Sequence, residues 1–273
     1  MNRTMIGKQV RIIAIVFVLG LLPASAFPEG PEASPAVRPF PAEVADTLKI
    51  PPGEAEKRLA GNTAALADMK NNQAGKLYRE YRQDGDMKKL YTALNTAGQA
   101  IKLDSGRYRY WVTLGNIHSE LARLNIFRAN EYAEESFRQA MELAPGDASV
   151  MVLLAVNLAG TGDYEEALEY FEKAAKTDVL ILSADISQWM NACYLADAQT
   201  SRGIIFYEDI QKSHPRYYFL NLYKAVLYKA HFDNDKAIRE LTQLLKRDDA
   251  DGATKEAARK LLGEINRKGG RTS

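Results

Sequence analysis

Cysteine is almost absent from this chain of 273 residues, which has one cysteine, three histidines and ten prolines. Because Cys193 stands alone, no disulfide can form within the chain. None of His118, His214 and His231 lies three to five residues from another histidine or from Cys193, so the spacing typical of metal ligands is missing. We therefore expect no metal and no cofactor, and we expect stability to come from the burial of apolar side chains.

An excess of charge of one sign is also absent, since 36 lysines and arginines face 35 aspartates and glutamates. Nucleic-acid partners need a concentrated positive surface, so this balance argues against them. No glycine-rich phosphate loop and no acid–base pair emerges. The carboxylate pairs Glu134-Glu135 and Glu165-Glu166 fall at expected helix starts, where the helix dipole explains them. The apolar setting of Cys193 indicates packing, so we expect that the protein is not an enzyme.

Long hydrophobic runs are missing as well, apart from one near the N-terminus. Residues 1–26 have the pattern of a signal peptide, in which the basic residues Arg3, Lys8 and Arg11 precede an apolar run from Ile12 to Leu22. These eleven residues are about half of the roughly 20 that span a bilayer, so we expect cleavage and no stable membrane span afterwards. An uncleaved anchor is the alternative. The prediction is an exported protein, periplasmic or secreted, with 33 basic and 35 acidic residues once the three basic ones are removed.

Proline is rare after the first fifth of the sequence. Seven of the ten prolines lie between Pro28 and Pro52, and only Pro145 and Pro215 follow. Dense proline favours extended, solvated chain, so residues 27–52 are predicted to be a linker, with a Pro-rich ligand motif as the alternative. The rest of the chain has few helix breakers and is free to form long helices.

What the sequence does contain is a repeated pattern of small and large apolar residues. Three residues recur after 34 positions, Ala133, Phe137 and Ala140 becoming Ala167, Phe171 and Ala174. In both copies the spacing places the three side chains on one face of a helix. A fixed period of this length indicates one supersecondary unit stacked on itself, so the sequence predicts a repeat array.

The residues before the first copy complete the pattern of a known family. Trp111, Leu114-Gly115 and His118 are spaced along one helix, and Pro145 follows the second helix. This pattern resembles the tetratricopeptide repeat (TPR), in which Trp, Leu-Gly and Tyr lie on a first helix, Ala, Phe and Ala on a second, and Pro at the exit. His118 stands in the Tyr position, and about six extra residues separate the two helices.

The next unit fits the family pattern without gaps. Met151, Leu154-Ala155 and Leu158 take the first-helix positions. The turn and the start of the second helix then match residue for residue over 162–167, where Gly162 supplies the turn and Asp163 is placed to cap the helix.

The match is weaker downstream of these two units. Gly203 aligns with Ala237, and Tyr207 with Leu241, again 34 residues apart. Either Met190 or Trp189 takes the Trp position in the first of these units. In the second, Lys224 falls on a nominally buried position, which counts against this register.

The resemblance implies an all-α fold, a right-handed superhelical array of α-α hairpins (a TPR-like solenoid), over residues 53–268. We expect four units, two clear and two degenerate, preceded by a leading helix over Gly53–Lys70. A polar-backed helix from about Thr254 to Arg267 is expected to cap the array, because stacked repeats require such an end. Residues 269–273 are expected to form a disordered tail, and an ordinary helical bundle with chance periodicity is the alternative fold.

The resemblance also indicates where a partner binds, because such arrays present an extended concave face lined by the first helices. It places eight residues of the two clear units on that face: Arg109, Val112, Asn116, Ser119, Ser149, Val152, Val156 and Ala159. Some family members grip C-terminal carboxylates with Lys, Arg and Asn. Val112, Val152 and Val156 do not supply that set, so we expect a helix or an apolar segment in the groove.

The leading functional hypothesis is an exported scaffold or adaptor that binds another protein or peptide segment through this face. The alternative is a periplasmic accessory protein that encloses a small hydrophobic ligand within the helical array, which requires a closed apolar cavity. Several tyrosines near the C-terminal units suit either a wet interface or helix packing. The sequence leaves the oligomeric state and the partner's identity open.

Overall fold

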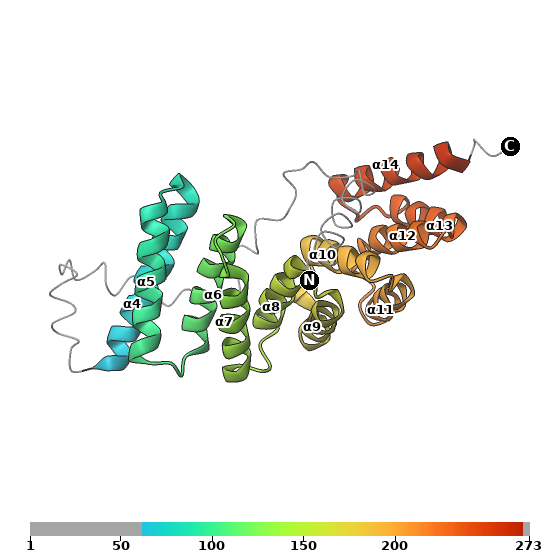
Figure 1. Ribbon diagram of the computed structural model, residues 1–273. Coiled ribbons are helices and arrows are strands. Elements are labelled where there is room, and N and C mark those ends of the chain that lie inside the picture. The colour runs from blue at the N-terminus through green and yellow to red at the C-terminus, as the bar shows by residue number, and fades with distance from the viewer. Residues whose placement is uncertain (1–61, 270–273) are drawn as a thin grey trace, which may run out of the picture. The chain divides into compact units, whose positions relative to one another are not determined.

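The computed structural model describes residues 62–269, and all regular secondary structure in that range is helical (Figure 1). The elements are α4 (Thr63–Asp84), α5 (Met87–Leu103), α6 (Tyr108–Arg123), α7 (Ala129–Leu143), α8 (Ala148–Thr161), α9 (Tyr164–Thr177), the 3-10 helix η1 (Val179–Ile181), α10 (Ala184–Ala196), α11 (Thr200–Ser213), α12 (Leu220–Ala230), α13 (Asn234–Leu245) and α14 (Gly252–Gly269). The all-α prediction is confirmed for this part of the chain.

The predicted signal peptide (residues 1–26), the predicted linker (27–52) and the last four residues of the predicted tail lie outside the described residues. Between residues 62 and 269, no helix combines the length and the apolar character that a membrane crossing requires.

The described chain divides into two compact units, an N-terminal unit of residues 62–157 and a C-terminal unit of residues 158–269. In the N-terminal unit α4 pairs with α5 and α6 with α7, and α6 also packs on α4 and α5. In the C-terminal unit α10 packs on α9, α11 and α12, while α12 pairs with α13. The closing helix α14 packs on α13 and α12, where the sequence predicts a capping helix.

The turns inside the hairpins share one backbone feature. Gly85, Gly162, Ala198 and Phe232 each follow a first helix, and each has a positive φ, between 57° and 94°. Ala198 and Phe232 are 34 residues apart, which matches the repeat period. The turn after α6 is longer, since residues 124–128 separate α6 from α7, so this loop accounts for part of the predicted insertion of about six residues.

The repeated small–large–small residues form the hairpin cores. All six are buried: Ala133, Phe137, Ala140, Ala167, Phe171 and Ala174. The Phe137 ring lies directly on Gly115, where an added Cβ would meet ring carbons at 2.5–2.9 Å. A larger residue at position 115 would push the two helices apart, so the Leu-Gly pair of α6 has a packing reason.

Two expectations about the start of the array are corrected. The leading helix is not a separate element, because α4 runs without a break from Thr63 to Asp84 and includes the expected first helix of the next unit. No proline interrupts this stretch, Asn62 caps its start by accepting from the Ala65 N–H at 3.1 Å, and Gly85 ends it in the left-handed conformation. In chain order, the helices α4–α13 therefore make up five successive pairs of a first and a second helix in the described residues, one pair more than expected.

The register of the two downstream units is also settled. In α10 the residues that face the hairpin core are Ser187, Met190, Asn191 and Tyr194, all buried. Ser187 therefore holds the Trp position, and neither Met190 nor Trp189 does. In α12 Lys224 is buried, as the expected register requires. Its charge is compensated there, because its Nζ lies 2.9 Å from the Glu240 carboxylate on α13.

Candidate partner-binding surfaces

The first predicted strip lies on α6 in the N-terminal unit. Val112, Asn116 and Ser119 are half-buried, and Arg109 is exposed. Spacings of three and four residues keep these side chains on one side of the helix. The strip mixes one cation, two small polar groups and one apolar side chain, and all four are accessible in part.

The second predicted strip lies on α8 and is less accessible. Ser149 and Val156 are half-buried, whereas Val152 and Ala159 are each only 3% exposed and offer no side-chain surface to a partner. The reason is that α8 is apolar around most of its circumference, and such a helix is buried on most sides. Ala159 also lies beyond the boundary of the N-terminal unit, which holds the other seven residues.

Buried polar contacts hold the first helices of the N-terminal unit together. The Tyr81 hydroxyl on α4 donates to Glu120 Oε1 on α6 at 3.2 Å, and Arg123 binds the other oxygen of Glu120 at 3.0 Å. Tyr110 on α6 donates to Asp68 on α4. Burial, reinforced by these carboxylates, raises the pKa of both tyrosines, so each hydroxyl stays a proton donor. The α6 strip is therefore presented on a fixed helix.

A second first-helix surface lies in the C-terminal unit, and the sequence reasoning missed it. We define the α10–α12 face as five half-buried residues that lie away from the hairpin cores, on α10, on α12 and, for Phe219, at the N-cap of α12: Trp189, Ala192, Phe219, Leu222 and Tyr223. It is apolar and aromatic. This face was not predicted because the sequence left the register of α10 open. Polar Ser187 and Asn191 occupy core positions that apolar residues hold in the clear units.

The α10–α12 face is built on a polar and aromatic framework. Asn191 Nδ2 donates to the Tyr223 carbonyl at 3.0 Å, and the Tyr223 hydroxyl donates to the Ala184 carbonyl at 2.7 Å, which ties α12 to α10. Ring centroids run from the core to the surface, with Tyr207 6.5 Å from Tyr223 and Tyr223 6.2 Å from Phe219. These contacts fix the orientation of the aromatic side chains that reach the surface.

Burial perturbs two side chains considered above for chemistry or metal binding, Cys193 and His118. Burial raises the pKa of the Cys193 thiol to about 12, so it is not a nucleophile near neutral pH. Burial lowers the pKa of His118, whose ring lies 5.4 Å from the ring of Tyr132. No cluster of three or more metal-binding side chains occurs between residues 62 and 269.

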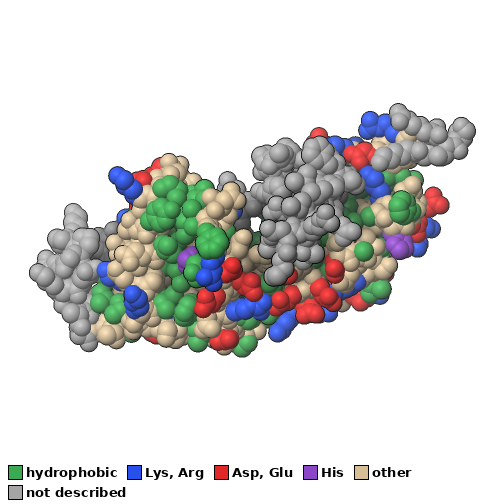
Figure 2. All heavy atoms as spheres, viewed as in Figure 1, with side chains coloured by type: hydrophobic (Ala, Val, Ile, Leu, Met, Phe, Trp, Pro, Cys, Tyr) green, Lys and Arg blue, Asp and Glu red, His purple; other side chains and the backbone are tan. Residues whose placement is uncertain are grey.

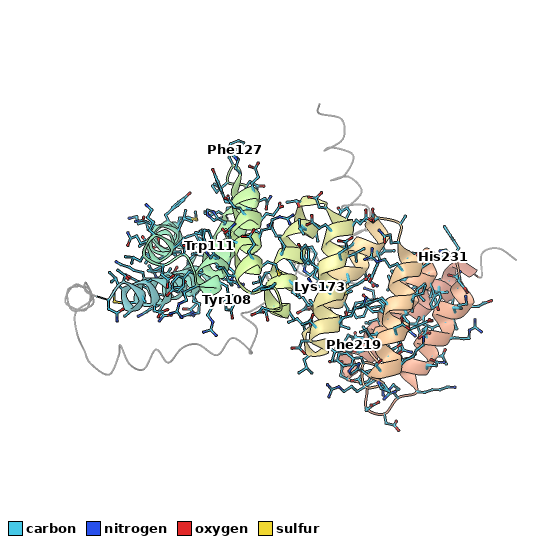
Figure 3. All side chains as sticks on the ribbon, turned by 90° about the horizontal axis from the view of Figure 1, so that it is seen from below. Tyr108, Trp111, Phe127, Lys173, Phe219 and His231 are labelled. Atoms are coloured by element: carbon cyan, nitrogen blue, oxygen red, sulfur yellow. The ribbon has the colours of Figure 1, made fainter. Side chains whose placement is uncertain are left out.

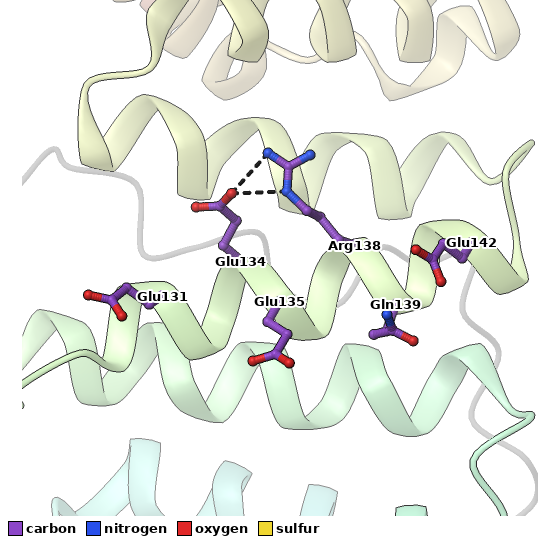
Figure 4. A pocket seen from close by; sticks show the side chains of 6 residues that line it. All are labelled: Glu131, Glu134, Glu135, Arg138, Gln139 and Glu142. Atoms are coloured by element: carbon purple, nitrogen blue, oxygen red, sulfur yellow. Dashed lines mark hydrogen bonds and ion pairs between the residues drawn. The ribbon is translucent and has the colours of Figure 1, made fainter.

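Two surface hollows are formed by second helices and turns rather than by the first-helix faces. One, of about 360 Å³, lies along α7 and is lined mainly by glutamates (Figure 4). The other, of about 420 Å³, lies at the α8–α9 turn and is lined by Asp163, Asp197 and three glutamates of α9, among others. Neither is the closed apolar chamber that a hydrophobic small molecule requires.

Comparison with known proteins bears directly on this fold. The family model of the tetratricopeptide repeat matches residues 148–178, the unit in which the sequence pattern is complete. No curated protein sequence matches the chain at a significant level. The fold is a TPR-like helical repeat solenoid.

Two solved structures illustrate the likeness. YrrB, a TPR protein with an unusual peptide-binding site, superimposes with a TM-score of 0.52 at 16% identity, over 75% of this chain and 96% of YrrB. The MamA protein gives a TM-score of 0.52 at 16% identity, over 68% of this chain and 92% of MamA. At such identity the likeness to both concerns the fold alone.

Proposed function

We propose that this protein is an exported scaffold that binds a protein or peptide segment through its first-helix surfaces, the α6 strip and the α10–α12 face. The observation that carries the proposal is the α10–α12 face, where Trp189, Phe219 and Tyr223 are half-buried and where contacts with neighbouring groups hold Phe219 and Tyr223. Aromatic side chains that are fixed and partly exposed are typical of interface centres. An apolar helix or extended segment suits such a surface.

The role of a scaffold is also supported by what the described residues do not offer to other functions. The hollows along α7 and at the α8–α9 turn are charged, which disfavours enclosure of a hydrophobic ligand. The elevated pKa of Cys193 disfavours thiol chemistry. TPR-like arrays are generally non-enzymatic, and binding rather than catalysis fits these features best.

Partner binding is tested by changing each face separately. Leu222→Glu places a charge on the α10–α12 face, and Asn116→Glu does so on the α6 strip, while Lys173→Glu on the exposed side of α9 is the matched control (Figure 3). Partners cross-linked in the native cell and identified by mass spectrometry should be lost with a face variant and retained with Lys173→Glu. Circular dichroism of the purified variants checks that the helices persist. Unchanged capture with both face variants would contradict the proposal.

Export is proposed from the pattern of residues 1–26 and is tested independently of binding. Mass spectrometry of the protein recovered from its native host should show an N-terminus near residue 27. Recovery with Met1 or Asn2 at the N-terminus, in the cytoplasmic fraction, would contradict export and leave the scaffold proposal standing.

A further inference from the structure

The loop between α6 and α7 carries the largest group of exposed apolar side chains in the N-terminal unit. We define the α6–α7 tip as Leu124, Ile126 and Phe127 in this loop and Tyr132 in the first turn of α7; all four are exposed. Phe127 is 87% exposed and lies at the outer end of the hairpin, pointing away from the helices (Figure 3). Exposed apolar groups of this kind mark interaction surfaces.

The fold does not require this loop. The other hairpin turns within the described residues need two or three residues, whereas the α6–α7 loop has five. Asn125 and Arg128 both have positive φ, 58° and 60°, a region that Asn adopts readily but that is unfavourable for Arg. The Ile126 N–H donates to the Leu121 carbonyl at 3.0 Å and the Asn125 N–H to Ala122 at 2.9 Å, so the loop has a defined conformation. A loop with a defined conformation that exposes apolar side chains instead of burying them points to binding.

The charges around the tip determine which partner fits. The two nearby cations are already paired, Arg128 with Glu131 at 2.6 Å and Arg123 with Glu120 at 3.0 Å. Arg128 also lies over the Tyr132 ring, 5.5 Å from its centroid. The tip therefore offers apolar and aromatic surface without a free cation of its own.

An acidic track continues from the tip along the outer side of α7. It consists of Glu131, Glu135, Gln139 and Glu142, spaced along one side of the helix (Figure 4). Glu135 and Glu142 are exposed, and among the described residues the ion pairs of Arg128 and Arg138 are with Glu131 and Glu134 instead. Figure 2 shows acidic side chains next to hydrophobic ones over this unit. From Glu131 to Glu142 the track extends about 16 Å at 1.5 Å per residue, or roughly three helical turns.

We propose that the α6–α7 tip and the acidic track form a second docking surface, for a basic amphipathic helical segment of a partner protein. The apolar side chains of that segment pack on Phe127, Ile126 and Tyr132, and its lysines and arginines lie along Glu135 and Glu142. The negative charge of the acidic track favours a basic partner segment. It would repel an anionic lipid surface, or a second copy of the chain with the same acidic track. This surface lies on a second helix and its preceding loop, outside the first-helix surfaces proposed above.

The test uses the purified chain and a defined probe. A fluorescein-labelled helical peptide of 14 residues with a leucine face and a lysine face is titrated and followed by anisotropy. Phe127→Ala should weaken binding on the order of tenfold, as for a central aromatic anchor, and Glu135→Lys with Glu142→Lys should weaken it similarly. The matched control is Phe232→Ala, since Phe232 is 94% exposed in the α12–α13 turn of the C-terminal unit. It should leave the affinity unchanged.

Further controls distinguish a basic helical segment from the other possible binding partners of this surface, which are an acidic peptide, a membrane and a second copy of the chain. A peptide with glutamate in place of each lysine should not bind, and added salt should weaken the lysine peptide. Equal effects of Phe127→Ala and Phe232→Ala, or binding of the glutamate peptide, would overturn the proposal. Phe127-dependent binding to phosphatidylglycerol vesicles would assign the tip to a membrane surface instead. Phe127-dependent dimerisation in sedimentation without peptide would assign it to a second copy. Either result would also overturn the proposal.

Discussion

The N-terminal and C-terminal units fill the same space between paired helices in two ways. In the α6–α7 hairpin the Phe137 ring rests on Gly115 with no polar atom involved. In the α10–α11 hairpin Asn191 and Tyr207 hold the corresponding positions, and the Tyr207 hydroxyl donates to Asn191 Oδ1 at 3.0 Å. A glycine–phenylalanine contact in one unit is thus replaced by a hydrogen-bonded asparagine–tyrosine pair in the other.

The difference shows that polar groups occupy the cores of the α10–α11 and α12–α13 hairpins in matched pairs. Lys224 is a second case, because its buried ammonium meets Glu240 at 2.9 Å. Glu172 is a third, since it accepts from the Tyr194 hydroxyl at 2.9 Å and from Arg202 at 2.7 Å. Buried polar atoms are tolerated when each finds a partner. The cores of the α10–α11 and α12–α13 hairpins should therefore be sensitive to loss of one partner, and the core of the α6–α7 hairpin to changes of volume.

The largest effects are expected from deleting the aromatic rings of the apolar hairpin cores. Phe137→Ala and Phe171→Ala should each lower the free energy of unfolding by about 3–5 kcal/mol, because a buried ring is lost and a cavity remains. Urea denaturation followed by circular dichroism measures the change. The exposed Phe232 serves as control, and its change to alanine should cost less than about 0.5 kcal/mol. A loss below about 1 kcal/mol for Phe137→Ala would show that the ring is not a core residue.

Breaking the Lys224–Glu240 pair tests the C-terminal unit. Lys224→Met should cost about 3 kcal/mol, because it leaves the Glu240 carboxylate poorly solvated and without its cation. Adding Glu240→Gln removes that charge and should recover at least half of the loss, since the amide still accepts the hydrogen bond from Asn221 Nδ2. Chemical denaturation of the single and double variants gives the comparison. Equal stability of the two variants would mean that the pair does not act as a unit.

A change of one methyl group tests the volume argument in the N-terminal unit. Gly115→Ala should cost about 1–3 kcal/mol, because the new Cβ would overlap the Phe137 ring. Gly98 in the middle of α5 is the matched control, since no atom lies within 4 Å of an added Cβ there. Gly98→Ala should raise the stability by about 0.5–1 kcal/mol through its better helix propensity. Thermal unfolding of the two variants should therefore shift in opposite directions.

The sequence was sufficient to predict the parts of the fold that the apolar pattern determines. The period of 34 residues identified the cores around Phe137 and Phe171, because small and large apolar residues recur there in the family order. The closing helix was predicted for the same reason, since Leu261 and Ile265 alternate with charged residues. The extra residues between α6 and α7 were also visible as an interruption of the pattern.

The remaining features depend on contacts between residues far apart in the chain. Asn191 looks like a surface residue in sequence, and only its partners Tyr207 in α11 and Tyr223 in α12 make it a core residue. The register of α10, and with it the α10–α12 face, could not be predicted without those contacts. The burial of Val152 and Ala159 was missed because spacing alone does not show that α8 is surrounded on most sides. The exposure of Phe127 likewise depends on the loop conformation.

The asparagine–tyrosine pair is tested by exchanging the two kinds of ring. Tyr207→Phe should cost about 1 kcal/mol, because Asn191 Oδ1 loses its donor in a buried site. The reciprocal Phe137→Tyr adds a hydroxyl beside Gly115, where no asparagine is available, and should cost about 1–3 kcal/mol. Chemical denaturation of each variant measures its loss in the free energy of unfolding, and the two losses are then compared. A stabilising Tyr207→Phe would show that the hydrogen bond contributes nothing.

The smallest predicted effect depends on pH and concerns His118, which occupies the position held by Tyr194 in α10. Burial lowers the pKa of His118 from its usual value of 6.5, so the unfolded chain takes up the proton first as the pH falls. The stability associated with the neutral ring is therefore present above about pH 6.5 and is lost progressively below it. His118→Gln keeps a polar side chain and removes this titration. Melting temperatures at pH 7.5 and 5.5 should fall further for the natural chain than for the variant, because the other titrating groups are common to both. An identical fall in both proteins would mean that His118 has the same pKa folded and unfolded, and that its ring is as well solvated in α6 as in the free chain.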